Sequence, residues 1–265
     1  MNGKEMFDLT GKKAVVVGGA GGIGQAIAEG LTEAGAQVMI SSRKEEALQR
    51  AQAELKESTG KDVLYCVGDA SKEADVENLL NTAVESMGTV DILVNSQGFN
   101  KKFPGTEFPE KEWDEMFATN VKSMMFTCKH FGKYFKDNDI HGKIINIGSV
   151  RGVRAVGNGG LGNVGYCSTK GAVEMLTKAY ASDLGPTINV NLIGPTLTYT
   201  PMMAASGVVP ADPVERAKRF AAGQPLARIG EVEDIKGPAI FLASAASDFM
   251  TGSSIYPDGG LTAIG

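Results

Sequence analysis

The 265-residue sequence predicts an α/β fold with a doubly wound parallel sheet of about seven strands. Short apolar runs rich in valine and isoleucine alternate with longer segments of helical spacing along the chain. This alternation is typical of parallel strands that are covered by helices on both faces. A cluster of glycines follows the first apolar run, and no linker or repeat divides the chain. We therefore expect a single domain over residues 1–265.

The first half of the chain contains four predicted strands and three predicted helices. Each strand is a short apolar run, as expected for strands buried on both faces. These strands are expected at 13–18, 37–42, 63–67 and 90–95. Apolar residues recur at helical spacing between them, which predicts helices at 23–34, 44–57 and 74–87. Gly35 and Gly88 follow the first and third helices, where glycine commonly ends a helix.

The second half repeats this pattern with longer helices. One long helix is expected over 110–135 and another over 166–184, each preceding or following a buried strand. The remaining elements are expected as strands at 143–148 and 188–193, helices at 213–222 and 232–245, and a short strand at 254–256.

Composition excludes several classes of function. A net charge of −5 and a pI near 5.2 argue against a nucleic-acid surface. No apolar run reaches the ~18 residues of a membrane span, and the N-terminus lacks the apolar core of a signal peptide. Three scattered cysteines and two histidines predict neither a disulfide framework nor a zinc site. We expect a cytoplasmic protein that binds no metal, nucleic acid or membrane.

The glycine cluster, residues 17–24, lies between the first predicted strand and the first predicted helix. Glycines allow a tight turn and a close approach of the backbone to a pyrophosphate, which the helix N-terminus then stabilises. The alternative is a turn that binds nothing. The strand before the cluster and the helix after it favour the dinucleotide site.

The residues after the second strand indicate which dinucleotide is bound. Ser42 and Arg43 stand where a carboxylate would hold the ribose hydroxyls of NAD, and Arg43 can instead pair with a 2′-phosphate. NADP(H) is therefore favoured. If Arg43 only ends the strand, NAD(H) is the alternative. Asp69 follows the third strand, where it is expected either beside the adenine or in a simple turn.

Tyr166 and Lys170 are four residues apart, so a helix places them on one face. A lysine ammonium beside a tyrosine stabilises the phenolate and lowers the tyrosine pKa from its usual value near ~10. Such a tyrosine can exchange a proton with a substrate oxygen. Ser149, at the end of a predicted strand, can donate to a carbonyl, or it can simply cap a turn. Asn120, within the predicted helix 110–135, is either an exposed polar residue or a break in the helix that holds a water.

Together these motifs resemble the short-chain dehydrogenase/reductase family, from about Leu9 to Gly260. Val17 replaces the family's usual threonine, and the family's Asn-Asn-Ala-Gly motif appears as Asn-Ser-Gln-Gly at 95–98, with both inner positions changed. The segments 225–231 and 256–260 also resemble family signatures. The resemblance implies a Rossmann fold with a cofactor half at about 9–150 and a substrate half at about 150–265. It also implies a homotetramer.

The resemblance further implies hydride transfer between a nicotinamide and a carbonyl carbon, with Tyr166 as acid or base. The implied catalytic residues are Asn120, Ser149, Tyr166 and Lys170. Together with the motifs above, it predicts cofactor contacts from Gly18, Gly22, Ile23, Gly24, Ser42, Arg43, Asp69, Ala70, Asn95, Gly98, Tyr166, Lys170, Pro195, Thr196, Thr198 and Thr200.

The expected substrate is a small molecule. Residues 100–113 resemble the matching region of gluconate and other sugar-acid or polyol dehydrogenases of the family. A carboxylate would be attracted by cations in and after this region, at Lys101, Lys102, Arg151 and Arg154. The long glycine-rich segment 150–165 is either a pocket wall or an inert loop.

Two alternatives stay open: a 3-oxoacyl-(acyl carrier protein) reductase, and a non-catalytic nucleotide-binding regulatory protein. Met202 and Met203, in a Gly/Ala/Pro-rich region, are expected in a mobile lid.

Overall fold

A computed structural model of the chain describes residues 2–155, 162–200, 210–221 and 224–264. The expected lid at Met202 and Met203 lies outside these residues, as does the middle of the segment 150–165. Seven parallel strands form one sheet in the order β3-β2-β1-β4-β5-β6-β9. They are β1 (Lys13–Val17), β2 (Gln37–Ser42), β3 (Leu64–Val67), β4 (Ile92–Asn95), β5 (Lys143–Ile147), β6 (Asn189–Ile193) and β9 (Ser254–Ile255). The predicted seven-stranded doubly wound sheet is confirmed.

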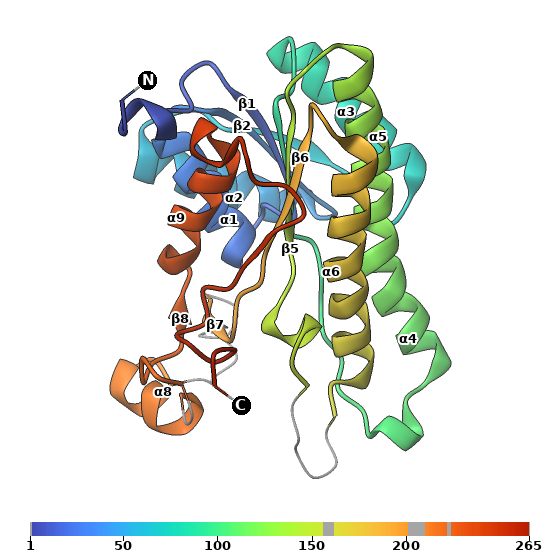
Figure 1. Ribbon diagram of the computed structural model, residues 1–265, viewed down its shortest axis with the longest axis vertical. Helices are drawn as coiled ribbons and strands as arrows, with labels where there is room; N and C mark the ends of the chain where they lie inside the picture. Colours follow the sequence, from blue (N-terminus) through green and yellow to red (C-terminus); the bar gives the residue numbers. More distant parts are fainter. Residues whose placement is uncertain (1, 156–161, 201–209, 222–223, 265) are drawn as a thin grey trace.

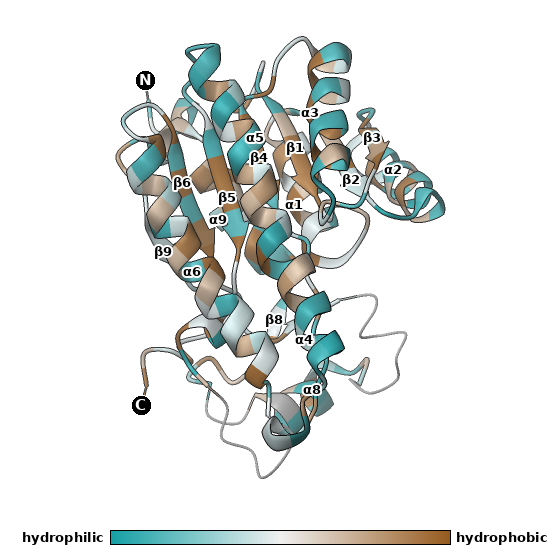
Figure 2. Cartoon of the chain, turned by 90° about the vertical axis from the view of Figure 1, so that its right-hand side faces the viewer, coloured by the Kyte–Doolittle hydropathy of each residue, from teal (hydrophilic) through white to brown (hydrophobic). Residues whose placement is uncertain are grey.

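Helices cover both faces of this sheet (Figure 1). One layer contains α1 (Gly22–Glu33), α2 (Glu45–Thr59) and α9 (Glu233–Ala243), and the other contains α3 (Glu73–Met87), α5 (Ser123–Asp137) and α6 (Val164–Leu184). Successive strand residues point to opposite layers, so Val16 belongs to the same core cluster as Ile27, while the adjacent Val15 belongs to the cluster that contains Phe131. Figure 2 shows hydrophobic strands between helices whose outer faces are largely hydrophilic. No helix in the described part of the chain is long and apolar enough to span a bilayer.

The helix expected over 110–135 is interrupted. It consists of α4 (Glu110–Phe117), a π-helical turn over Ala118–Lys122 and then α5. Asn120 lies in this turn and is fully buried, so the prediction that it breaks the helix is confirmed. Short π-helical turns inside α-helices are frequent at functional sites.

A second, two-stranded sheet was not predicted. It pairs β7 (Thr198–Tyr199) with β8 (Gly230–Glu231), and each strand is too short to leave a periodic signal in the sequence. Helix α8 (Pro213–Phe220) is fastened to it by Arg216. The Arg216 guanidinium stacks 3.8 Å from the centroid of the Tyr199 ring and lies 2.5 Å from Glu231 Oε1.

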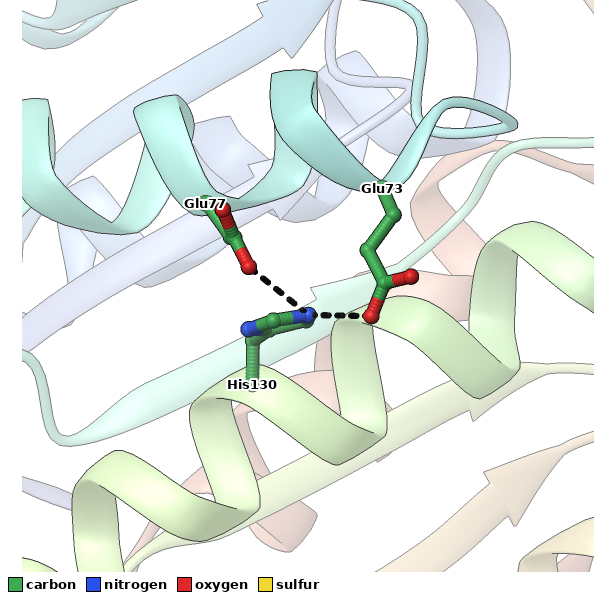
Figure 3. A group of neighbouring side chains, drawn as sticks. All are labelled: Glu73, Glu77 and His130. Carbon is green, nitrogen blue, oxygen red and sulfur yellow. Dashed lines mark hydrogen bonds and ion pairs between the residues drawn. The ribbon is translucent and has the colours of Figure 1, made fainter.

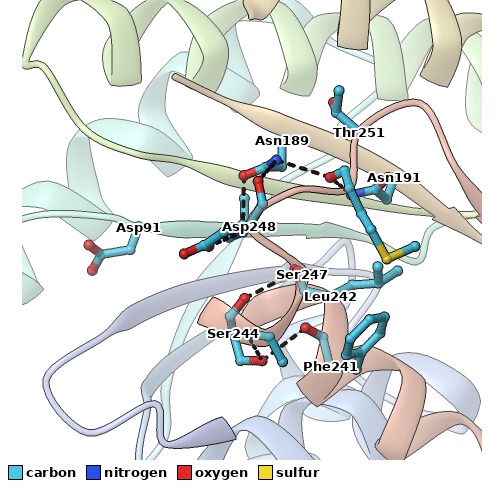
Figure 4. Close-up of polar contacts among 12 residues, drawn as sticks. Asp91, Asn189, Asn191, Phe241, Leu242, Ser244, Ser247, Asp248 and Thr251 are labelled. Atoms are coloured by element: carbon cyan, nitrogen blue, oxygen red, sulfur yellow. Dashed lines mark hydrogen bonds and ion pairs between the residues drawn. The ribbon is translucent and has the colours of Figure 1, made fainter. Parts of the chain in front are cut away.

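Backbone hydrogen bonds pair the last strand with β6, and side-chain amides hold the chain that leads into it. Asn189 Nδ2 donates to the backbone carbonyls of Asp248 and Met250 at 3.1 and 3.0 Å, and Asn191 Nδ2 donates to that of Met250 at 2.8 Å (Figure 4). These contacts bring the C-terminal segment back along β6, so that it ends beside the carboxyl edge of the sheet.

Candidate active site

The glycine loop between β1 and α1 is packed too closely for side chains. A Cβ on Gly24 would lie 2.2 Å from the Gly18 carbonyl oxygen, and one on Gly18 would lie 2.7 Å from Gln97 N. Gly18 has a φ of +80°, a conformation that favours glycine. No side chain caps the start of α1 at Gly21. The loop therefore presents backbone N–H groups at a helix N-terminus, the arrangement that binds phosphate groups.

The segment after β6 returns to this loop. A Cβ on Gly22 would lie 3.4 Å from Thr200 Cγ2, so Thr200 lies beside the glycine loop. Thr198 is buried, and its hydroxyl donates to the Thr196 carbonyl at 3.1 Å. Thr196 also lines a cavity of about 410 Å³ whose other walls are formed by residues 225–234 and 256–260. The structure thus places the segment 196–200 beside the glycine loop, two regions whose contacts with the cofactor stay predictions.

The ends of β2 and β3 place Arg43 and Asp69 near each other. Burial raises the pKa of Asp69, but hydrogen bonds from Ser71 and the charges of Arg43 and Lys72 bring that pKa below its usual value. Asp69 Oδ1 accepts from the Ser71 N–H at 3.0 Å, so Asp69 has the turn role. Arg43 is exposed at this edge of the sheet, next to Ser42, while Ala70 packs against the core. Contacts of these four residues and of Ile23 with a cofactor stay predictions.

Asn95 is fully buried in a network of side chains below the edge of the sheet. Its Nδ2 donates to Asn146 Oδ1 at 2.9 Å, and its Oδ1 accepts from Thr127 Oγ1 at 2.7 Å. Gln97, one of the two positions that depart from the family motif, donates to Ser123 Oγ at 3.0 Å. Asn95 therefore ties β4 to β5 and α5, and its predicted contact with the cofactor stays a prediction.

Asn120 links the π-helical turn to the loop after β4 and to α6. Its Oδ1 accepts from the Phe99 N–H at 2.9 Å, while its Nδ2 donates to the Phe99 carbonyl at 2.9 Å and to Thr169 Oγ1 at 3.1 Å. A Cβ on Gly98 would lie 3.3 Å from Asn120 Oδ1 and 3.6 Å from Lys170 Nζ. Asn120 and Lys170 therefore both lie close to Gly98. The water expected between them stays a prediction.

Ser149 and Tyr166 meet where β5 ends and α6 begins. Ser149 is buried, its Oγ accepts from the Arg151 N–H at 3.1 Å, and it lies 3.4 Å from the Pro195 carbonyl oxygen. Burial raises the pKa of Tyr166, and a hydrogen bond with Ser149 opposes this rise only in part. The direction is opposite to the lowered tyrosine pKa expected from the four-residue spacing.

The pKa of Tyr166 is raised chiefly by its own burial, and Lys170 is buried beside it. The Lys170 side chain is 4% exposed, its Nζ donates to the Ile147 carbonyl at 2.8 Å, and Nζ lies 5.6 Å from the centroid of the Tyr166 ring. Burial lowers the pKa of Lys170 to about 8, so its charge is lost in mildly alkaline solution. A four-residue spacing predicts proximity, but it does not reveal burial.

The lowered Lys170 pKa predicts a pH-dependent stability. Between the folded pKa of about 8 and the unfolded value near ~10.4, the unfolded chain binds more protons, so this group makes stability rise with pH by up to ~1.4 kcal/mol per unit. Lys170→Met removes this dependence. Urea unfolding is measured from pH 7 to 9.5. The unfolding free energy of the variant should exceed that of wild type most at pH 7, and this difference should narrow above pH 8. A difference that stays constant would contradict the assignment.

Two supporting residues were missed by the sequence argument. Thr169 accepts the hydrogen bond from Asn120, and Gly152 packs so closely on α6 that a Cβ would lie 2.8 Å from the Lys170 carbonyl oxygen. A glycine three residues after Ser149 was a signal for close packing, whereas nothing in the sequence distinguished Thr169.

A separate cluster of possible metal ligands lies between α3 and α5 (Figure 3). His130 Nε2 lies 2.9 Å from Glu73 Oε1 and 3.8 Å from Glu77 Oε1. The Lys129 ammonium already lies 2.5 Å from the same Glu73 oxygen. The cluster is thus a network of polar contacts between two packed helices, and it includes none of the residues around Tyr166.

Comparison with known proteins identifies the family. The family model described as enoyl-(acyl carrier protein) reductase, a model of short-chain dehydrogenases/reductases, matches residues 18–262. Gluconate 5-dehydrogenase of Gluconobacter oxydans (strain 621H) is 34% identical over 263 residues, covering 99% of both chains. The chain belongs to the short-chain dehydrogenase/reductase family. As a member of this family, it is an oxidoreductase that acts on CH–OH groups.

Two further dehydrogenases are similar to nearly the whole chain. The 2-dehydro-3-deoxy-D-gluconate 5-dehydrogenase of Dickeya dadantii (strain 3937) is 35% identical, covering 96% of each chain. The crystal structure of a gluconate 5-dehydrogenase from Burkholderia cenocepacia J2315, in complex with NADP and tartrate, has a TM-score of 0.89 and 32% identity and covers both chains completely. The fold and the family expected from the sequence motifs are therefore confirmed.

Proposed function

We propose that this protein uses NADP(H) to interconvert a hydroxyl and a carbonyl on a sugar acid, with Tyr166 as acid and base. The observation that carries the proposal is the convergence of Tyr166, Ser149, Lys170 and Asn120 at the carboxyl edge of β4 and β5. In open parallel sheets, ligands bind at this edge, outside the point where the strand order reverses. Here that point lies between β1 and β4, directly at the glycine loop.

The residues of this edge have complementary roles in the proposal. When bound, a nicotinamide cofactor supplies or accepts the hydride. Tyr166 removes the hydroxyl proton in oxidation and returns it in reduction, and Ser149 positions the same oxygen by donating a hydrogen bond. Lys170 stabilises the phenolate when it is protonated. Because Asn120 lies beside Lys170 across Gly98, it is placed to hold a water that carries protons to solvent.

The choice of NADP(H) is supported by Arg43. Its guanidinium is exposed beside the end of β2, where it can pair with a 2′-phosphate. Asp69, the carboxylate nearby, is engaged in its own turn with Ser71. The Burkholderia cenocepacia relative was solved with NADP, as was a putative 2-deoxy-D-gluconate 3-dehydrogenase from Agrobacterium tumefaciens.

The substrate class is supported by the relatives named for gluconate and its derivatives. Neutral sugars and polyols are the nearest alternative, because hydroxyl-rich molecules differ from sugar acids only at the carboxylate. A 3-oxoacyl-(acyl carrier protein) reductase is a second alternative, because the matching family model is described by another reaction on acyl carrier protein substrates. The expected homotetramer stays a prediction.

A turnover screen at 340 nm tests the proposal. The protein is assayed with NADP(H) and NAD(H) in parallel against sugar acids, polyols, simple ketones and an acetoacetyl thioester. We expect the strongest signal with a sugar acid and NADP(H). A signal with the thioester alone would replace the proposal with the acyl reductase, and tight cofactor binding without any turnover would favour the regulatory alternative.

A further inference from the structure

The cations that the sequence offers for a substrate carboxylate have very different surroundings. Lys101 is already paired, since its Nζ contacts the carboxylates of Glu112 and Glu115 on α4, the second at 3.1 Å. Lys102 is exposed to solvent, where screening weakens its attraction for an anion. Neither lysine therefore provides a directed, partly buried site for a carboxylate.

Arg154 is engaged in a different way. Its Nη1 donates to the backbone carbonyls of Leu261 and Ile264, the second at 3.2 Å, which joins the loop after β5 to the C-terminal segment. These contacts give Arg154 a structural role in holding two segments together.

Arg151 is held next to the proposed catalytic residues. It lies in the short 3-10 turn Val150–Gly152, and its backbone N–H donates to Ser149 Oγ at 3.1 Å. The close packing of Gly152 on the Lys170 carbonyl fixes this turn against α6. The Arg151 side chain is partly buried, and its guanidinium is close enough to Tyr166 for its positive charge to oppose the rise that burial causes in the tyrosine pKa.

The Arg151 guanidinium lacks an acidic partner. It makes no hydrogen bond or ion pair with any residue in the described ranges, and no Asp or Glu occurs among the remaining residues of the chain. Burial lowers the pKa of Arg151 and the charge of Arg154 adds to this, while Cys167 and Tyr166 oppose the fall only in part. A partly buried charge without a partner is costly, and a guanidinium matches a carboxylate with two parallel hydrogen bonds.

We propose that Arg151 binds the carboxylate of the substrate beside the oxygen that Tyr166 and Ser149 contact. The inference rests on the proposed function, which it makes more specific: a sugar acid supplies the missing partner of Arg151, whereas a neutral polyol leaves the guanidinium unpaired. Arg151 is then the residue that selects acids over polyols of the same length.

The test compares gluconate with glucitol, which has a CH₂OH group in place of the carboxylate. The ratio of kcat/KM for the two is measured in wild type, Arg151→Gln, Arg151→Lys and the control Lys102→Gln, which removes an exposed charge. Arg151→Gln should lower the ratio roughly 10- to 100-fold, as expected for loss of a charged hydrogen-bonded pair. The ratio for Arg151→Lys should lie between those of Arg151→Gln and wild type, and the ratio for Lys102→Gln should equal that of wild type.

Binding of tartrate to the NADP⁺-loaded protein, measured by calorimetry, supplies a readout that needs no turnover. If tartrate binds more weakly to Arg151→Gln but not to Lys102→Gln, the inference is supported. This holds even if the protein oxidises no alcohol, because the lack of turnover would overturn only the proposed function. Turnover with an unchanged acid-to-polyol ratio and unchanged tartrate binding in Arg151→Gln would overturn the inference and leave the function standing. The inference would also be overturned if Lys102→Gln weakened tartrate binding as much as Arg151→Gln, or if the wild type did not bind tartrate.

Discussion

Tyr166→Phe is expected to lower kcat by ~10²- to 10⁴-fold, the usual contribution of a positioned acid or base. Phenylalanine keeps the ring that packs beside Lys170 and removes only the hydroxyl that interacts with Ser149. The glycine loop and the segment 195–200 are untouched, so the Kd for NADPH should stay close to that of wild type. Steady-state turnover at 340 nm and quenching of NADPH fluorescence measure the two quantities.

Tyr180→Phe is a matched control. Tyr180 is also partly buried on α6, and its hydroxyl donates to the Met125 carbonyl at 3.1 Å. Its loss should cost about 1 kcal/mol of stability and leave kcat near that of wild type. If Tyr166→Phe turned over as fast as Tyr180→Phe, the acid and base would have to be sought elsewhere.

Gly24→Ala is expected to abolish cofactor binding at protein concentrations where the wild type is saturated. The new Cβ would lie 2.2 Å from the Gly18 carbonyl oxygen, and this neighbour is backbone, so the glycine loop must shift. Overpacking of this kind typically costs about 1–3 kcal/mol, and the displaced N–H groups could no longer converge on a phosphate. Quenching of NADPH fluorescence and urea unfolding measure both effects.

Gly237→Ala is the corresponding control within α9. Among the described residues, no atom outside its chain neighbours and the backbone of α9 lies within 4 Å of a Cβ built at Gly237, so alanine meets no tertiary neighbour there. Because Pro238 follows and restricts the helical backbone of the residue before it, no gain in stability is expected. The cofactor binding of Gly237→Ala should match wild type. Equal cofactor affinities in Gly24→Ala and Gly237→Ala would mean that the glycine loop is not the phosphate site.

The parts of the fold that repeat a local pattern were predictable from the sequence. The strands of the large sheet are apolar runs, and the loop 17–24 has a strand before it and a helix after it, so their places followed from periodicity. The pairing of β7 with β8 was not predictable, because a strand of two residues has no period. The interruption of the helix 110–135 could be anticipated only because asparagine is a poor helix former at Asn120.

The site was predictable in position but not in electrostatics. The Tyr166–Lys170 spacing placed the two side chains together, while the raised pKa of Tyr166 and the lowered pKa of Lys170 each depend on burial in the folded chain. The partners of the cations depend on tertiary structure in the same way. Lys101 meets two carboxylates of α4, whereas Arg151 meets none in the described structure, and no local sequence pattern separates these outcomes.

The Arg154 contacts have a practical consequence for handling the protein. Because this side chain holds the carbonyls of Leu261 and Ile264, the end of the chain is joined to the same loop that carries Arg151. The two termini lie at opposite ends of the molecule (Figure 1). A purification tag or an immobilising linker joined to the C-terminal segment would be connected through Arg154 to the loop that carries Arg151, the residue proposed to bind the substrate. The amino terminus is therefore the better point of attachment.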